Sequence, residues 1–129
     1  MNSLLSATSL HSHILVVDDV ADNSFLLQVL LEDEGYQVEV ADSGAAALAK
    51  IELAPPQLVL LDVMMPGMNG YEVAQQIREN VGLPFIPIVM VTGHDQLTLS
   101  EDLQVDGFLR KPIEFDDLLS QVHAILDSH

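Results

Sequence analysis

The chain has 129 residues and a mass of 14.1 kDa, which fits one compact domain with a single hydrophobic core. It contains no cysteine, so disulfides, thiolate zinc sites, iron–sulfur clusters and a catalytic thiol are excluded, and a cytoplasmic location is expected. Twenty acidic residues against four basic ones give a formal net charge of −16, which disfavours binding to nucleic acid or to anionic membranes and suits a divalent cation or a basic partner.

The first twelve residues, MNSLLSATSLHS, differ in composition from the rest of the chain. They contain no lysine or arginine, and serine and threonine interrupt their leucines, so they do not form a secretory signal. We expect residues 1–12 to form a flexible arm and residues 13–129 to form the domain. The alternative is a short amphipathic helix around Leu4, Leu5 and Leu10. No apolar run approaches the ~20 residues that a membrane-spanning helix needs, so no membrane partner is expected.

Five segments are typical of β-strands. Three are continuous apolar runs, which indicates strands buried on both faces of a sheet, whereas a fourth alternates and the last is brief. The continuous runs are residues 13–18, 57–62 and 87–92, the alternating segment is 36–41, and the brief one is 107–110.

Five helices are predicted to alternate with these strands. Asp22 or Asn23 can cap the first helix, and Gly35 provides the left-handed residue that ends it. Asp42 or Ser43 can cap the second helix. The helices are expected at residues 24–34, 45–53, 71–80, about 95–104, and 114–126.

This alternation predicts a doubly wound α/β domain, in which a parallel sheet is covered by helices on both sides and the crossovers are right-handed. Ligands of such sheets bind beyond the carboxyl ends of the strands, so the functional side chains are expected there.

Polar side chains do follow the predicted strands at their carboxyl ends. Each one alone is common as a helix cap or a solvated side chain, but three carboxylates placed together repel unless a cation or a proton joins them. Carboxylate oxygens favour Mg²⁺, and a lysine is a matching charge for a phosphoryl group. We therefore hypothesise that Asp62 is phosphorylated. The residues concerned are Asp18, Asp19, Asp62, Thr92 and Lys111.

Four motifs, in order along the chain, make residues 13–127 resemble the receiver domain of two-component response regulators. The resemblance implies a flavodoxin-like sheet of five parallel strands in the order 2-1-3-4-5, with five helices on its two faces. The motifs are ILVVDD at 14–19, LVLLDVMMPGMNG at 58–70, VMVTG at 89–93 and DGFLRKP at 106–112.

The resemblance also implies roles for individual residues. Asp62 would accept a phosphoryl group from a phosphohistidine of a sensor histidine kinase or a histidine phosphotransfer protein. Asp19, Asp62 and the backbone carbonyl of Met64 would bind Mg²⁺, with Asp18 acting indirectly, and Lys111 would pair with the phosphate. No other cofactor is implied. The chain would be a signalling domain that catalyses only its own phosphorylation and dephosphorylation, not an enzyme.

By the same resemblance, Thr92 would turn its hydroxyl toward the phosphate and Phe108 would be the switch aromatic. The Lys111–Pro112 bond is expected to be cis. Movement of Phe108 would change a surface that an unknown downstream protein reads. The segment between Thr92 and Lys111 is shorter than is usual in the family, so the fourth helix is expected to be about a turn short and to end differently at Gln104.

The first helix carries more apolar residues than one core-facing side requires. Leu27, Leu30 and Leu31 would cover the sheet, which leaves Phe25 and Val29, one turn apart, on the opposite side. We weigh two interpretations equally: scattered exposed apolar residues, or a docking stripe for the kinase or phosphotransfer protein.

Several alternatives are considered. A degenerate receiver that binds partners without phosphate would lack an active-site residue, and none is missing. An aspartate-nucleophile phosphohydrolase needs a second Asp two residues after the nucleophile, where this chain has Met64. A flavin carrier needs a phosphate loop rich in glycine and hydroxyls, where this chain has DDVADN. Met64, Met65 and Met68 are expected to pack and not to bind a soft metal, and the histidines show no ligand spacing.

Overall fold

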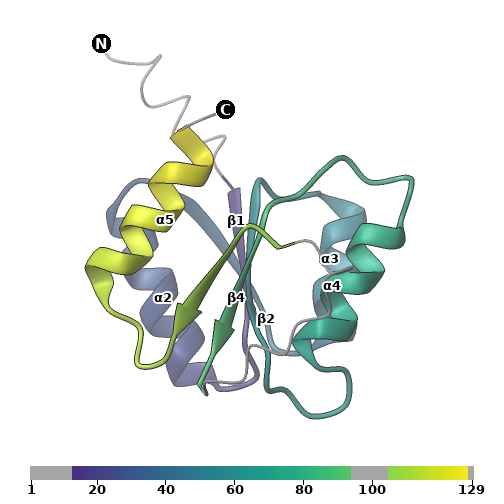
Figure 1. The fold of residues 1–129 in the computed structure, drawn as a ribbon, viewed down its shortest axis with the longest axis horizontal. Coiled ribbons are helices and arrows are strands. Elements are labelled where there is room, and N and C mark those ends of the chain that lie inside the picture. Colours follow the sequence, from purple (N-terminus) through teal and green to yellow (C-terminus); the bar gives the residue numbers. More distant parts are fainter. Residues whose placement is uncertain (1–12, 94–104, 128–129) are drawn as a thin grey trace.

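The computed structural model describes residues 13–93 and 105–127, in which strands and helices alternate as predicted from β1 to β4 (Figure 1). All neighbouring strands pair in parallel, in the order β2-β1-β3-β4-β5, which confirms the flavodoxin-like sheet. The elements are β1 (His13–Val17), α2 (Ala21–Asp33), β2 (Gln37–Ala41), α3 (Gly44–Leu53), β3 (Leu58–Asp62), α4 (Gly70–Glu79), β4 (Ile88–Thr92), β5 (Gly107–Arg110) and α5 (Phe115–Asp127).

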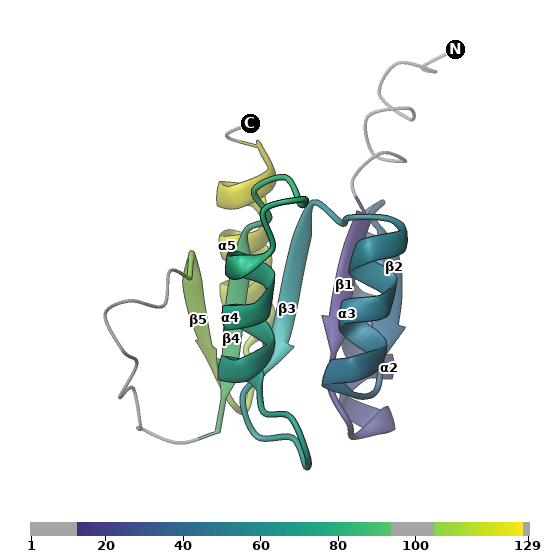
Figure 2. The ribbon, with the colours of Figure 1, turned by 90° about the vertical axis from the view of Figure 1, so that its right-hand side faces the viewer.

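The helices cover both faces of the sheet. Helices α2 and α5 lie on one face, and α3 and α4 lie on the other (Figures 1 and 2). The expectation of five helices needs correction, because the described part of the chain contains four. The fourth predicted helix, at about 95–104 and ending at Gln104, lies outside the described residues. The arm of residues 1–12 also lies outside them.

Two separate apolar layers form the core, because successive residues of a strand point to opposite faces. In β1, Ile14 and Val16 belong to the layer beneath α2 and α5, whereas Leu15 and Val17 belong to the layer beneath α3 and α4. The three continuous apolar runs therefore are the strands buried on both faces, with β3 and β4 buried along their whole length.

Local sequence accounts for two of the helix ends. The Ser43 side chain accepts a hydrogen bond from the Ala46 N–H at the start of α3, and Gly35, with φ of 97°, follows α2. The predicted cap of α2 was wrong: this helix begins at Ala21, and its N-cap residue Val20 makes no side-chain cap hydrogen bond. Among the described residues, no helix has the length and apolarity that crossing a membrane requires.

Candidate functional site

Three acidic side chains meet at the carboxyl edge of the sheet. Asp18 follows β1, where its N–H donates to the Ala41 carbonyl over 3.1 Å and so extends the strand pairing, and Asp62 is the last residue of β3. One carboxylate oxygen from each of Asp18, Asp19 and Asp62 lies within 4.8 Å of the others. The predicted convergence of these acids is therefore present.

The three acids differ in their exposure to water. Asp18 and Asp62 are each 3% exposed, whereas Asp19 is exposed. The N–H of Val20 donates to Asp18 Oδ1 over 2.9 Å, which orients that carboxylate. Two buried carboxylates and one exposed carboxylate thus form a cluster that opens to solvent on one side.

Lys111 is the cation of this cluster. Its Nζ lies 3.2 Å from Asp62 Oδ1 and 3.7 Å from Asp18 Oδ2. The pKa of Asp62 is raised, first by its burial and then by the charge of Asp18, and the opposing effect of Lys111 is smaller. One ammonium therefore compensates the buried negative charge incompletely.

The donor set fits a hard divalent cation. Asp62 Oδ1 is buried and accepts no hydrogen bond in the described structure, although it lies in ion-pair range of Lys111. Carboxylate oxygens are the ligands that Mg²⁺ prefers, and the exposed Asp19 leaves a side from which an ion with bound waters can enter. The three acids can hold such an ion.

Thr92 lies on the strand next to that of Asp62, and Phe108 lies on the strand beyond it. Thr92 ends β4 and is 5% exposed, and its carbonyl accepts the Lys111 N–H over 2.8 Å. Phe108 in β5 is paired in register with Met90 and packs on the same apolar layer as Met90. Because Met90 and Thr92 are two residues apart in one strand, the Thr92 side chain and Phe108 share a face of the sheet. The predicted cis bond between Lys111 and Pro112 is present.

The structure places the other predicted residues at the periphery of the site. Met64 lies two residues after Asp62, and its side chain is 64% exposed. On α2, Leu27 and Leu31 are buried, whereas Phe25 and Val29 are 65% and 44% exposed, as their helical spacing predicted.

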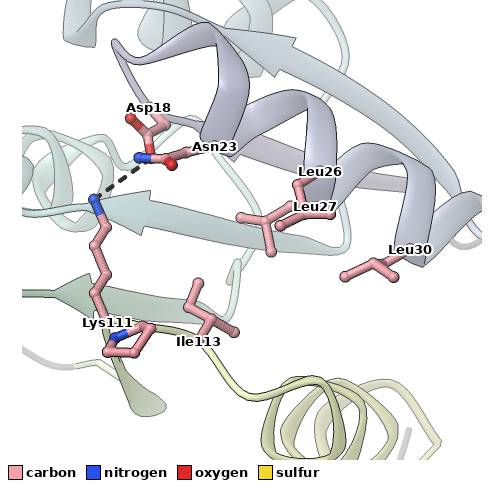
Figure 3. Close-up of a pocket in the computed structure, with 8 residues that line it drawn as sticks. Asp18, Asn23, Leu26, Leu27, Leu30, Lys111 and Ile113 are labelled. Carbon is pink, nitrogen blue, oxygen red and sulfur yellow. Dashed lines mark ion pairs between the residues drawn. The ribbon is translucent and has the colours of Figure 1, made fainter.

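Sequence reasoning missed a groove that begins at the site. It has a volume of about 460 Å³ and runs between α2 and the segment after β5 (Figure 3). Asn23 lies at its polar end with Asp18 and Lys111, and Leu26, which is 57% exposed, lies farther along α2. Asn23 could have been found from its position in the first turn of the helix that follows Asp18.

Gly70 was also missed as a residue of the site. A Cβ at this position would meet the backbone carbonyl oxygen of Asp62. The signal in the sequence was the capping pattern of Asn69 and Glu72, which starts α4 at Gly70, directly against the end of β3.

Comparison with known proteins gives one consistent family. The profile of the response regulator receiver domain matches residues 14–123. Protein PilH of Pseudomonas aeruginosa is 33% identical over 118 residues, which cover 89% of this chain and 98% of PilH. The DNA-binding response regulator MtrA of Mycobacterium tuberculosis is 34% identical over 118 residues, 92% of this chain and 52% of MtrA. The chain thus spans about half the length of MtrA.

Solved structures agree with these sequence matches. A putative response regulator from Chloroflexus aurantiacus superposes with a TM-score of 0.83 at 29% identity. The superposition covers 90% of this chain and 98% of the Chloroflexus chain. A CheY-like response regulator receiver domain protein from Methanospirillum hungatei gives a TM-score of 0.83 at 33% identity and covers 91% and 94% of the two chains.

Proposed function

Because this chain belongs to the receiver domain family of response regulators, we propose that Asp62 is its phosphoacceptor and that phosphorylation of Asp62 switches a protein-binding surface. The observation that carries this proposal is the environment of Asp62, a buried carboxylate 3.2 Å from the ammonium of Lys111 and clustered with two further acids. Transfer of a phosphoryl group depends mainly on positioning and on charge neutralisation. The buried position of Asp62 fixes the nucleophile, and Lys111 together with a cation held by the acids can neutralise the charge of the phosphoryl group.

In this proposal Asp19 and Asp62 hold Mg²⁺ directly, with the backbone carbonyl of Met64, and Asp18 acts indirectly by orienting the others. A bound ion would neutralise negative charge on the incoming phosphoryl group. Its entry also removes the repulsion that three neighbouring carboxylates suffer in its absence.

The donor is a phosphohistidine of a histidine kinase or a histidine phosphotransfer protein. A carboxylate oxygen of Asp62 forms a bond to phosphorus while the bond from phosphorus to the imidazole nitrogen breaks, and the imidazole keeps the electron pair and later takes a proton. Lys111 is already within ion-pair distance of Asp62, so it can hold the transferred group as the negative charge moves onto it.

The switch follows from the added charge. Phosphorylation brings about −1.5 to −2 charge into a site lined by acids, so Lys111 and the Thr92 hydroxyl close on the phosphate. Phe108 packs on the same face of the sheet as Thr92, and a shift of Thr92 changes the space available to its ring. The two states differ by few contacts, so a few kcal/mol redistributes their populations.

The docking surface for the donor is proposed on α2. Phe25 and Val29 form an exposed apolar stripe on this helix, and Leu26 between them is also exposed. The same helix contributes Asn23 to the groove that leads to Lys111, so a protein bound along α2 lies next to the reacting carboxylate (Figure 3). In this proposal the chain is cytoplasmic, and an unknown downstream protein would read the surface near Phe108.

The test is incubation of the wild type with acetyl phosphate and Mg²⁺, followed by intact-mass measurement. We expect one added phosphoryl group on the wild type and on the control Asp117→Asn, whose carboxylate is exposed on α5, and none on Asp62→Asn. An unmodified wild type under these conditions, or equal labelling of Asp62→Asn, would refute the proposal. An unmodified wild type that still binds its partner would instead support a phosphate-independent binding module.

A further inference from the structure

The groove that begins at Lys111 is polar at one end and apolar along the rest of its length (Figure 3). Asp18, Asn23 and Lys111 form the polar end, and the Lys111 ammonium lies 3.2 Å from Asp62 Oδ1. One end of the groove can therefore hold an anion next to the phosphoacceptor, and the rest can hold an apolar chain. The apolar wall residues are Leu26, Leu27 and Leu30 from α2, and Pro112 and Ile113 from the segment after β5.

The size and shape of this groove fit a small molecule. Its volume of about 460 Å³ lies within the range of roughly 300 to 1,000 Å³ that is typical of small-molecule sites. Leu27 is 5% exposed and belongs to the apolar layer beneath α2 and α5, so this wall of the groove is part of the packed core. Leu30 and Ile113 pack against the same layer. A ligand that enters therefore meets a preformed surface, and little ordering is required of the groove.

The groove is distinct from the stripe that we assign to a protein donor. Phe25 and Val29 are 65% and 44% exposed on α2, but they are not among the described residues that line the groove. Leu26, which is 57% exposed, lies where the two surfaces meet. A protein helix can pack on the convex stripe, whereas the concave groove suits a slender molecule with one anionic end.

The charges at the polar end select the kind of anion. The three carboxylates outnumber the Lys111 ammonium by two charges, which a bound divalent cation cancels. A phosphoryl group then gains both the attraction of Lys111 and a place for its oxygens on the cation. Because the overall charge of −16 repels free anions, a small phosphodonor gains from any apolar contact that it can make beside this site.

We propose that this groove is a subsite for the leaving group of small phosphodonors, and that it makes acyl phosphates with an apolar chain better donors than acetyl phosphate. The inference rests on the proposed function of Asp62. A carboxylate oxygen of Asp62 forms a bond to phosphorus while the bond from phosphorus to the acyl oxygen breaks, and the released carboxylate keeps the electron pair. The acyl chain lies along Leu26 and Ile113 during this step.

The first test compares hexanoyl phosphate with acetyl phosphate, each at the same low concentration with Mg²⁺ and the full chain. The two leaving carboxylates have nearly equal basicity, so a difference in the rate of labelling, followed by intact mass, reports binding of the chain. A fully buried methylene contributes roughly fourfold, so with about half of the longer chain buried we expect hexanoyl phosphate to react roughly tenfold faster. Equal rates would overturn the subsite and leave the phosphoacceptor role of Asp62 in place. Absence of labelling by either donor would overturn both.

Two leucine variants locate the contact. Leu26→Ser should reduce the ratio of the hexanoyl to the acetyl rate several-fold, and because Leu26 is 57% exposed the change should leave the fold intact. The matched control Leu53→Ser, which alters an 88% exposed leucine at the end of α3, should keep both the ratio and the acetyl rate of the wild type. A preference for hexanoyl phosphate that Leu26→Ser leaves unchanged counts against the groove.

The second test measures binding without transfer. Hexylphosphonate, which carries no leaving group, should bind the wild type with Mg²⁺ roughly tenfold more tightly than methylphosphonate does. It should shift the methyl resonances of Leu26 and Ile113 and leave those of Leu53 unchanged. Equal affinity for the two phosphonates, or tight binding without a shift at Ile113, would overturn the proposal.

Discussion

Replacing Asp62 by asparagine should make the metal-free protein more stable. In the wild type the buried Asp62 carboxylate lies among like charges, and its raised pKa shows that burial and Asp18 together outweigh the attraction of Lys111. The asparagine side chain keeps nearly the same volume without the charge. Lys111 remains paired, because its Nζ lies 3.7 Å from Asp18 Oδ2, so the change leaves no isolated buried cation.

The magnitude follows from the distances. At an effective dielectric constant of about 20, two unit charges 4.8 Å apart, the upper limit within the cluster, repel by roughly 3.5 kcal/mol. The attraction of Asp62 to Lys111 at 3.2 Å is roughly 5 kcal/mol on the same scale. Repulsion from Asp18 and the more strongly screened Asp19 nearly cancels this attraction, and the burial of Asp62 tips the balance. We expect a gain of about 1 to 2 kcal/mol in the free energy of unfolding.

The assay is urea unfolding at neutral pH in a chelating buffer and again with Mg²⁺. Asp62→Asn should unfold at higher urea than the wild type in the chelator, whereas Asp117→Asn should differ little from the wild type. Mg²⁺ at ten times its dissociation constant should stabilise the wild type by about 1.4 kcal/mol, and it should stabilise Asp62→Asn less.

The pH dependence has a defined sign. Because the folded-state pKa of Asp62 lies above its ordinary value of 3.8, the ionised carboxylate destabilises the fold at neutral pH. Protonation relieves this cost, so the advantage of Asp62→Asn should shrink as the pH falls through the folded-state pKa and disappear below the unfolded-state value. A variant less stable than the wild type in the chelator, or an advantage that grows on acidification, would refute the reasoning.

Two further predictions concern the elements that hold the site. Ser43→Ala removes the acceptor for the Ala46 N–H at the start of α3 and should lower the free energy of unfolding by about 1 kcal/mol in urea titrations; equal midpoints for variant and wild type would contradict this cap. Gly70→Ala places a Cβ against the Asp62 carbonyl, so it should cost about 1 to 3 kcal/mol and slow phosphorylation by acetyl phosphate. Gly82→Ala, where a Cβ meets only a flexible side chain, is its control, and similar rates for the two variants would show that Gly70 does not position Asp62.

The sequence was most informative where a pattern repeats locally. Continuous apolar runs predicted the strands that are buried on both faces, and glycine and serine predicted the ends of α2 and α3. Helical spacing predicted that Phe25 and Val29 are exposed on α2. The exposure of Leu26 on the same helix was not predicted. The predicted cap of α2 was wrong because an aspartate or asparagine near a helix start can also lie within its first turn, as Asp22 does.

The sequence by itself thus determined the order and type of the elements and the edge at which the acids gather, because helix and strand periods are properties of the local backbone. Only the tertiary structure decided that Lys111 lies 3.2 Å from Asp62, that Asp62 is buried while Asp19 is exposed, and that a groove runs from Lys111 along α2. Distances and burial of this kind depend on how segments far apart in the chain pack against one another, and no local pattern encodes them.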